Sequence, residues 1–326
     1  MKQSFGYRTA MNGTIAFVAT VCAIPIFAQS PAKPVRILVG FSAGSGTDGA
    51  ARMVGRKLSE MLGQPFLVEN RPGSGGMIAT EMVSKAPPDG STLLMMAAAD
   101  SIQPAMRVKM PYNLPQDFSP LAYVATGIFV LTVHPSVPAR NVKELINLAR
   151  TKAGGLNFAT SGIGASAHFA GELFNHIAKV RTIAVAYQGS PQAALAVVSG
   201  EVDLAYPTYT SARPLLDASR LRALAVTTAR RSVLMPHTPT MHESGLLGYD
   251  RAAWYGVVGP RGMPPELVNR LADVIGKAAG SPEIKANLLE QGLVAETSTP
   301  QEFSEFIRRE VEQNIELGRL AGLSKQ

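Results

Sequence analysis

A glycine-rich segment near residue 45 carries the clearest signal for ligand binding. It reads Phe41-Ser42-Ala43-Gly44-Ser45-Gly46-Thr47-Asp48-Gly49, follows an apolar run typical of a strand, and leads into a helical pattern. Glycines let the backbone turn tightly and approach a ligand closely, and the free N–H groups at the start of a helix attract anions. The segment therefore predicts a site for an anionic group.

The same type of segment recurs later in the chain. Residues 157–166 read Asn-Phe-Ala-Thr-Ser-Gly-Ile-Gly-Ala-Ser, and residues 187–191 read Tyr-Gln-Gly-Ser-Pro; each leaves a predicted strand and enters a predicted helix. In open α/β sheets, ligands bind at the carboxyl ends of the strands, where such loops lie. We expect a ligand held between loops from two halves of the molecule.

A dinucleotide site is the main alternative for the first segment. Gly44, Gly46 and Gly49 fit the pattern G-x-G-x-x-G, and Glu69 lies 20 residues after Gly49, as expected for a ribose-binding carboxylate in a nicotinamide-dependent oxidoreductase. Against it, Asp48 would place a negative charge beside the pyrophosphate. A purely structural interpretation, a glycine-rich turn with Asp48 as a helix cap, is compatible with ligand binding.

Two further patterns suggest catalysis or metal binding, and both are weak. Ser166, His168 and Asp203 could form a hydrolase triad, but the residues around Ser166 do not read G-x-S-x-G. His168, Glu172 and His176 are spaced by four residues along one predicted helix and could bind a metal. Only two of them are imidazoles, which makes this a weak set of metal ligands.

Short apolar runs alternate with longer amphipathic stretches, which predicts how these loops are positioned. Strands are expected at 35–41, 66–68 and 92–97, with helices at 49–62 and 77–84 between them. This β-α-β-α-β order is typical of a doubly wound sheet with helices on both faces. A second series of the same kind begins at residue 127 and ends near residue 227. We predict an α/β fold with two lobes.

Composition excludes several classes of protein. The 326 residues are 46% hydrophobic and 17% charged, which indicates a globular chain rather than a disordered one. One cysteine, Cys22, is too few for a disulfide framework. The formal net charge of +7 comes from basic residues that are spread along the chain and not interleaved with aromatic residues. Nucleic-acid binding is therefore not expected.

The first 28 residues differ from the rest of the chain. Lys2 and Arg8 supply positive charge, residues 14–28 form an apolar stretch, and Ala28 is a small residue suited to cleavage. The stretch is shorter than the roughly 20 residues that span a bilayer. It predicts a secretory signal peptide cleaved near Ala28, and hence a periplasmic protein.

The order of motifs resembles the Bug-type (TctC-like) extracytoplasmic receptors of tripartite tricarboxylate transporters. The resemblance covers nearly the whole mature chain, and one local departure is Ser42-Ala43-Gly44-Ser45, where a Pro-x-Gly-Gly type of loop is expected. The motifs that carry it are Gly44 to Asp48, Glu69-Asn70-Arg71-Pro72-Gly73-Ser74-Gly75-Gly76, Pro88-Asp89-Gly90-Ser91-Thr92-Leu93-Leu94, Ser161-Gly162-Ile163-Gly164, His168, Gly171-Glu172-Leu173-Phe174, Tyr187-Gln188-Gly189-Ser190, Gly200-Glu201-Val202-Asp203, Leu221 to Thr227, Pro239-Thr240 and Trp254-Tyr255-Gly256.

The resemblance implies a Venus-flytrap solute receptor, monomeric, without enzymatic activity or cofactor. It implies a first lobe of residues 31–126 plus 250–326 and a second of residues 127–249, closing around a small carboxylate that is then delivered to a membrane permease. Main-chain N–H groups at helix starts suit such a ligand without a buried arginine. The implied ligand-binding residues are Ala43, Gly44, Ser45, Thr47 and Asp48 in the first lobe and Thr160, Ser161, Gly164, Ser166, Tyr187 and Asp203 in the second.

Overall fold

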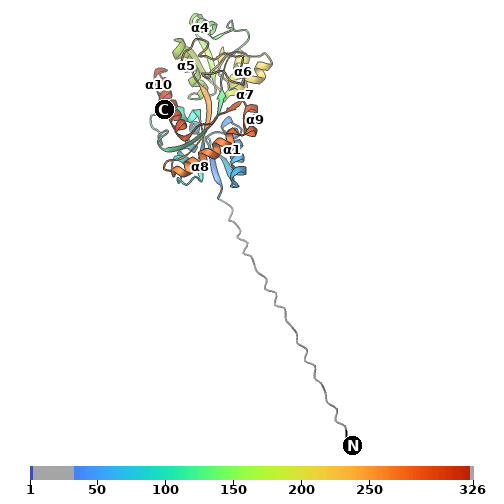
Figure 1. Cartoon of the computed structure of the whole chain (residues 1–326). Helices are drawn as coiled ribbons and strands as arrows, with labels where there is room; N and C mark the ends of the chain where they lie inside the picture. The colour runs from blue at the N-terminus through green and yellow to red at the C-terminus, as the bar shows by residue number, and fades with distance from the viewer. Residues whose placement is uncertain (3–32, 324–326) are drawn as a thin grey trace. The chain divides into compact units, whose positions relative to one another are not determined.

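The computed structural model describes Met1, Lys2 and residues 33–323 (Figure 1). The chain divides into two units, residues 1–32 and residues 33–326, and the second unit holds the fold. The predicted signal peptide lies outside the described residues, apart from Met1 and Lys2. No helix among those described is long and apolar enough to cross a membrane.

A six-stranded sheet forms the centre of one half of the fold, which we call the first lobe. Its strands lie in the order β11-β4-β10-β3-β1-β2; β1 runs parallel to β2 and β3, whereas β10 is antiparallel to both β3 and β4. The strands are β1 (Val35–Val39), β2 (Phe66–Asn70), β3 (Thr92–Ala97), β4 (Phe118–Ile128), β10 (Ala252–Pro260) and β11 (Leu293–Ala295).

A five-stranded sheet forms the centre of the second lobe. Its order is β7-β6-β8-β5-β9, with β6 parallel to β7 and β8 and with β5 antiparallel to β8 and β9. The strands are β5 (Val130–Val133), β6 (Leu156–Thr160), β7 (Thr182–Ala186), β8 (Leu204–Ala205) and β9 (Arg222–Val226). Two mixed sheets with interspersed helices confirm the predicted α/β fold class.

Helices pack on these sheets through their apolar faces. Those of the first lobe are α1 (Gly46–Leu62), α2 (Met77–Ser84), α3 (Ala98–Met106), α8 (Pro265–Gly280), α9 (Pro282–Glu290) and α10 (Pro300–Leu320). Those of the second lobe are α4 (Val142–Thr151), α5 (Ser166–Ala178), α6 (Ser190–Val198) and α7 (Tyr209–Asp217). Sequence signals explain several helix starts: Ser45 caps α1, and Thr299 and Glu302 form a capping box at α10.

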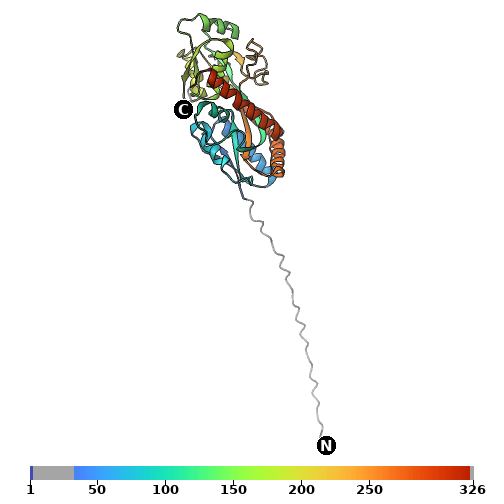
Figure 2. The same ribbon diagram turned by 90° about the vertical axis from the view of Figure 1, so that its left-hand side faces the viewer.

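The chain crosses between the sheets twice, once from β4 to β5 and once from β9 to β10. Buried Thr227 joins the two crossings, because its Oγ1 lies 3.1 Å from the carbonyl oxygen of Phe129 and 2.6 Å from that of Arg251. Helix α10 runs from beside the first sheet to the second lobe (Figure 2). There Leu317 packs with Ile102, Ala105 and Met106 of α3 and with Phe169 of α5 in an apolar cluster that both lobes share.

Candidate functional site

A cavity of about 280 Å³ lies between the two lobes. Its first-lobe wall comes from the loops after β1 and β2 and from α3, and its second-lobe wall is the loop between β6 and α5. Both β1 and β6 are parallel strands that end at this level, so the position follows the general rule for ligands in α/β sheets. The lining residues are Phe41, Ser74, Gly75, Ala99, Gln103, Met106 and Arg107 on one side and residues 161–165 on the other.

The loop 161–165 offers main-chain donors to this cavity. Gly162 (φ +139°) and Gly164 (φ +80°) adopt backbone conformations that disfavour other residues, and the Thr160 hydroxyl donates to the Gly162 carbonyl at 3.2 Å. Among the described residues, none accepts a hydrogen bond from the N–H of Ser161, Gly162 or Ile163. Unpaired N–H groups in a loop that leads into a helix N-terminus are suited to bind an anion.

His168 holds this loop in place. Its Nδ1 accepts a hydrogen bond of 3.2 Å from the Gly164 N–H, so the proton of the neutral ring belongs on Nε2. Burial lowers the pKa of His168 to about 4, which keeps the ring neutral and able to accept. The ring stacks on Phe158. His168 is therefore a positioning residue for the donors of the loop.

Asp48 does the same for the loop after β1. Its carboxylate accepts hydrogen bonds from the Gly44 N–H (2.9 Å), Arg52 Nε (3.0 Å) and Asn70 Nδ2 (2.9 Å). Burial alone would raise the pKa of Asp48, but these hydrogen bonds outweigh it and lower the pKa below its ordinary value. The N-cap of α1 is Ser45, so the suggested capping role of Asp48 is wrong; Asp48 instead holds the loop through the Gly44 N–H, and a carboxylate so fully paired offers little to an anionic ligand.

The remaining predicted residues of the first lobe lie on the same loop. Ser45 caps α1, Thr47 is buried, and Ala43 and Gly44 are exposed. The N–H groups of Ala43 and Thr47 donate to no described residue. Of residues 41–48, Phe41 lines the cavity and the others do not.

In the second lobe, Ser161 and Gly164 line the cavity, and Thr160 and Ser166 flank the loop. Tyr187 follows the neighbouring strand β7, and its N–H donates to the Thr160 carbonyl at 2.9 Å. Its ring packs against the apolar cluster around α6, and burial together with the nearby charge of Glu201 raises its pKa. Tyr187 thus supports the loop from the side.

Asp203 does not join the other predicted residues, and this part of the prediction is corrected. It precedes β8, and its carboxylate accepts the N–H of Asn157 at 2.8 Å and pairs with Lys152. Because β6 and β8 are parallel, this is the amino end of the strands, whereas the cavity lies at the carboxyl end. The motif that contains Asp203 indicates a structural ion pair.

The structure explains the dinucleotide-like glycines by packing. A Cβ on Gly46 would lie 2.6 Å from the Tyr255 hydroxyl oxygen, and one on Gly49 would lie 2.5 Å from Gln291 Oε1. Glu69 is engaged by Arg36 at 2.7 and 2.9 Å and by Arg71 at 3.1 Å. Gly46 lets α1 lie close to β10, and Glu69 joins β2 to β1 through Arg36. The spacing of the glycines and Glu69 thus has a structural explanation that needs no nucleotide.

The catalytic and metal alternatives find no support in the geometry. Asp203 lies at the opposite end of the sheet from Ser166 and His168, so these three residues do not form a triad. His168 Nε2 lies 3.6 Å from Glu172, but His176 is exposed. Within the described part of the chain, no three His, Cys, Asp or Glu side chains are arranged to hold a metal ion.

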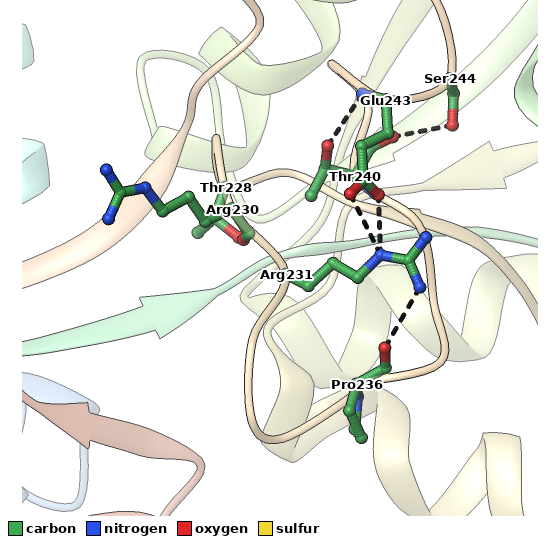
Figure 3. Close-up of polar contacts among 7 residues, drawn as sticks. All are labelled: Thr228, Arg230, Arg231, Pro236, Thr240, Glu243 and Ser244. Atoms are coloured by element: carbon green, nitrogen blue, oxygen red, sulfur yellow. Dashed lines mark hydrogen bonds and ion pairs between the residues drawn. The ribbon is translucent and has the colours of Figure 1, made fainter.

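A second hollow, of about 330 Å³, lies beside the crossings between the lobes. Its lining includes Trp254, whose indole N–H donates to Glu310 at 3.0 Å, and Glu296, which accepts from Thr126 at 2.8 Å. In the segment that borders it, Arg231 pairs with Glu243 and donates to the Pro236 carbonyl (Figure 3). The lining carries both signs of charge, because Asp250, Glu296 and Glu310 lie there together with Arg230 and Arg231, so it offers no uniformly positive surface to a carboxylate.

Sequence reasoning missed the first-lobe wall of the cavity. Ser74 and Gly75 belong to a glycine-rich motif after β2 that served the resemblance and was not assigned to the ligand. Gln103 lies in α3 and Arg107 directly follows it, and the sequence pattern did not predict this helix. No local signal marked Arg107, because a single arginine after an apolar stretch is a common arrangement.

Comparison with known proteins places this geometry in context. Residues 50–323 match the family described as the tripartite tricarboxylate transporter family receptor. An R. palustris protein solved with adipate has 33% sequence identity and a TM-score of 0.78, covering 91% of this chain and 99% of that one. The periplasmic binding protein BugD has 29% identity and a TM-score of 0.75 over 91% and 100% of the two chains. MatC of Rhodopseudomonas palustris with bound malate has 27% identity and a TM-score of 0.75 over 89% and 100%.

Proposed function

Because the chain belongs to the receptor family of tripartite tricarboxylate transporters, we propose that it binds a small carboxylate between its lobes and delivers it to a membrane permease. The expected resemblance to Bug-type receptors is confirmed, and the two-lobed fold is that of periplasmic binding proteins. Two similar proteins were solved with adipate and with malate, which supports a carboxylate ligand here.

The observation that carries the proposal is the set of unpaired N–H groups on the loop 161–163. These residues line the cavity and lead into α5, whose N-terminus adds positive potential. Hydrogen bonds to an ionised carboxylate are about twice as strong as neutral ones, so a few such donors suffice to hold it. Ser161, Gly164 and Ser166 are the predicted residues that we assign to the ligand from the second lobe.

Closure of the lobes would complete the site. We place the boundary between them at residues 126/127 and 249/250, close to the crossings from β4 to β5 and from β9 to β10. The loop 42–47 would then add the donors of Ala43 and Thr47 to those of the second lobe. A ligand that contacts both lobes favours the closed form, because only that form makes both sets of contacts.

Export to the periplasm is part of the same proposal. The leader ending at Ala28 would be removed, so the mature chain would begin at Gln29. Intact-mass measurement on protein recovered from the periplasmic fraction tests this step. A chain that retains residues 1–28 in that fraction would contradict it.

Thermal unfolding with a panel of acids tests ligand binding directly. Adipate and malate are compared with adipamide, which has the length of adipate but no charge. A ligand at 100 times its dissociation constant should add about 2.7 kcal/mol to the free energy of unfolding. We expect stabilisation by at least one carboxylate and none by the diamide. A shift with adipamide alone would contradict the proposal.

Gly164 provides a variant with a matched control. An alanine Cβ there would lie 3.3 Å from Met106 Cγ of the opposite lobe, whereas Gly154 has nearly the same φ (+81° against +80°) with open space around it. Both substitutions strain the backbone by about 1 kcal/mol. We predict that G164A weakens carboxylate binding at least tenfold in calorimetric titration and that G154A leaves it unchanged. Equal affinities of the two variants would argue against this cavity as the site.

A further inference from the structure

Arg107 brings a positive charge to the interlobe cavity. Among the described residues that line the cavity, it is the one with a formal charge, and the others are apolar, small or neutral polar residues. It directly follows α3, whose last residue, Met106, packs against Gly164. Arg107 therefore lines the cavity from the first lobe, opposite the donor loop 161–163.

The guanidinium of Arg107 is left without a partner. Its Nε is buried and donates no hydrogen bond, and none of residues 33–323 forms an ion pair or side-chain hydrogen bond with its other nitrogens. A buried donor that loses its water without gaining an acceptor destabilises the fold, and more so when it is charged. Such a group on a cavity wall indicates that an anion from outside the chain completes it.

The geometry of the group narrows the class of ligand. A guanidinium holds its N–H donors in one plane, and two of them match the two oxygens of a carboxylate; because Nε is buried, the pair left for a ligand is that of the two Nη atoms. The donors on the opposite wall already suit one carboxylate. The cavity volume of about 280 Å³ lies near the lower limit of small-molecule sites, roughly 300 Å³, so both anionic groups must belong to one small molecule.

We propose that Arg107 binds the second carboxylate of a dicarboxylate ligand and so selects dicarboxylates over monocarboxylates. The inference rests on the proposed function, since it assigns the substrate class of the same site. It also adds a cationic anchor to a pocket whose other donors are neutral. Arg107 is then a specificity-determining residue.

Calorimetric titration with paired acids tests the assignment. Adipate is compared with hexanoate, which keeps the chain length and one carboxylate, and malate is compared with 2-hydroxybutyrate in the same way. The proteins are the wild type, R107Q, R107K and the control K109Q. Lys109 is exposed two residues away and does not line the cavity, so K109Q makes the same change in net charge.

We expect the wild type and K109Q to bind each dicarboxylate at least tenfold more tightly than the monocarboxylate with which it is compared. R107Q should weaken dicarboxylate binding about 10- to 100-fold, the value of a charged hydrogen-bonded contact, and leave monocarboxylate binding unchanged. R107K should fall between, because an ammonium keeps the charge but not the planar pair of donors.

Two results would overturn the assignment. If R107Q loses affinity for the dicarboxylate and the monocarboxylate equally, Arg107 acts on the fold and not on the second carboxylate. If the affinity of R107Q for the dicarboxylate is unchanged, Arg107 lies outside the site. Failure of the wild type to bind any acid is a different result, which would overturn the proposed function and this inference together.

Discussion

At the scale of single residues, the neutral state of His168 sets a pH limit on the site. Its pKa is about 4 in the folded chain against an ordinary value of 6.5, so the unfolded chain takes up the proton first as pH falls. The contribution of His168 to the free energy of unfolding should therefore decrease from about pH 6.5 downwards. The full loss of about 3 kcal/mol is reached near pH 4. Protonation also removes the acceptor for the Gly164 N–H.

A variant isolates this effect from other titrating groups. The buried Asp100 has its pKa raised to about 7, so its contribution changes in the opposite direction, decreasing stability as pH rises from 3.8 to 7. H168Q keeps an acceptor but cannot take up the proton. As pH falls from 7 to 4, chemical denaturation should show the free energy of unfolding of H168Q rising relative to that of the wild type, by up to about 3 kcal/mol. Identical pH profiles would contradict the assigned role of His168.

At the scale of elements, glycines set how closely α1 approaches β10. We predict that G46A lowers the free energy of unfolding by about 1–3 kcal/mol, the usual cost of overpacking, because its Cβ would lie 2.6 Å from the Tyr255 hydroxyl oxygen. Adding Y255F removes that oxygen and leaves the ring carbon at 3.4 Å, so the double variant should regain most of the loss.

Gly276 supplies the control for this cycle. It lies inside α8 with no atom near its Cβ position, so G276A should stabilise the protein by about 0.5–1 kcal/mol. The measurement is denaturant unfolding of the wild type and of the three variants G46A, G46A/Y255F and G276A. If Y255F fails to rescue G46A, the explanation of these glycines by packing is wrong.

The sequence predicted those elements whose patterns are local. The bounds of α2 and β3 agree with the predicted ranges 77–84 and 92–97, because hydrophobic patterning marks them. Helix α3 was missed, since its residues, Ala98 to Met106, follow the fully buried β3 with no polar break and include Pro104. For the same reason its cavity residues Gln103 and Arg107 were missed.

Contacts between residues far apart in the sequence explain the other differences between the predicted and the observed structure. Asp203 was expected at the ligand because the family resemblance implied it, but its carboxylate pairs with Lys152, which is 51 residues away. The sheets also contain antiparallel strands where the chain crosses between lobes, and β4, which pairs with both β10 and β11, was not predicted as one element. Such contacts depend on tertiary structure and leave no periodic signal.

At the scale of the whole molecule, one side of the interlobe boundary is already packed. The apolar cluster of α3, α5 and α10 and the Thr227 hydrogen bonds hold the lobes together there, so closure should be a rotation about that side. X-ray scattering with saturating adipate or malate should give a smaller radius of gyration than the free protein. An unchanged profile with bound ligand would contradict closure.

The most direct test of the account is an amide-resolved NMR titration of the mature protein with adipate or malate. Main-chain binding predicts that the N–H signals of Ser161, Gly162 and Ile163 shift the most and saturate together, with the Gly154 signal unmoved. The indole signal of Trp254, beside the second hollow, should also stay in place. Saturable binding that shifts the Trp254 indole and leaves residues 161–163 unchanged would contradict the account.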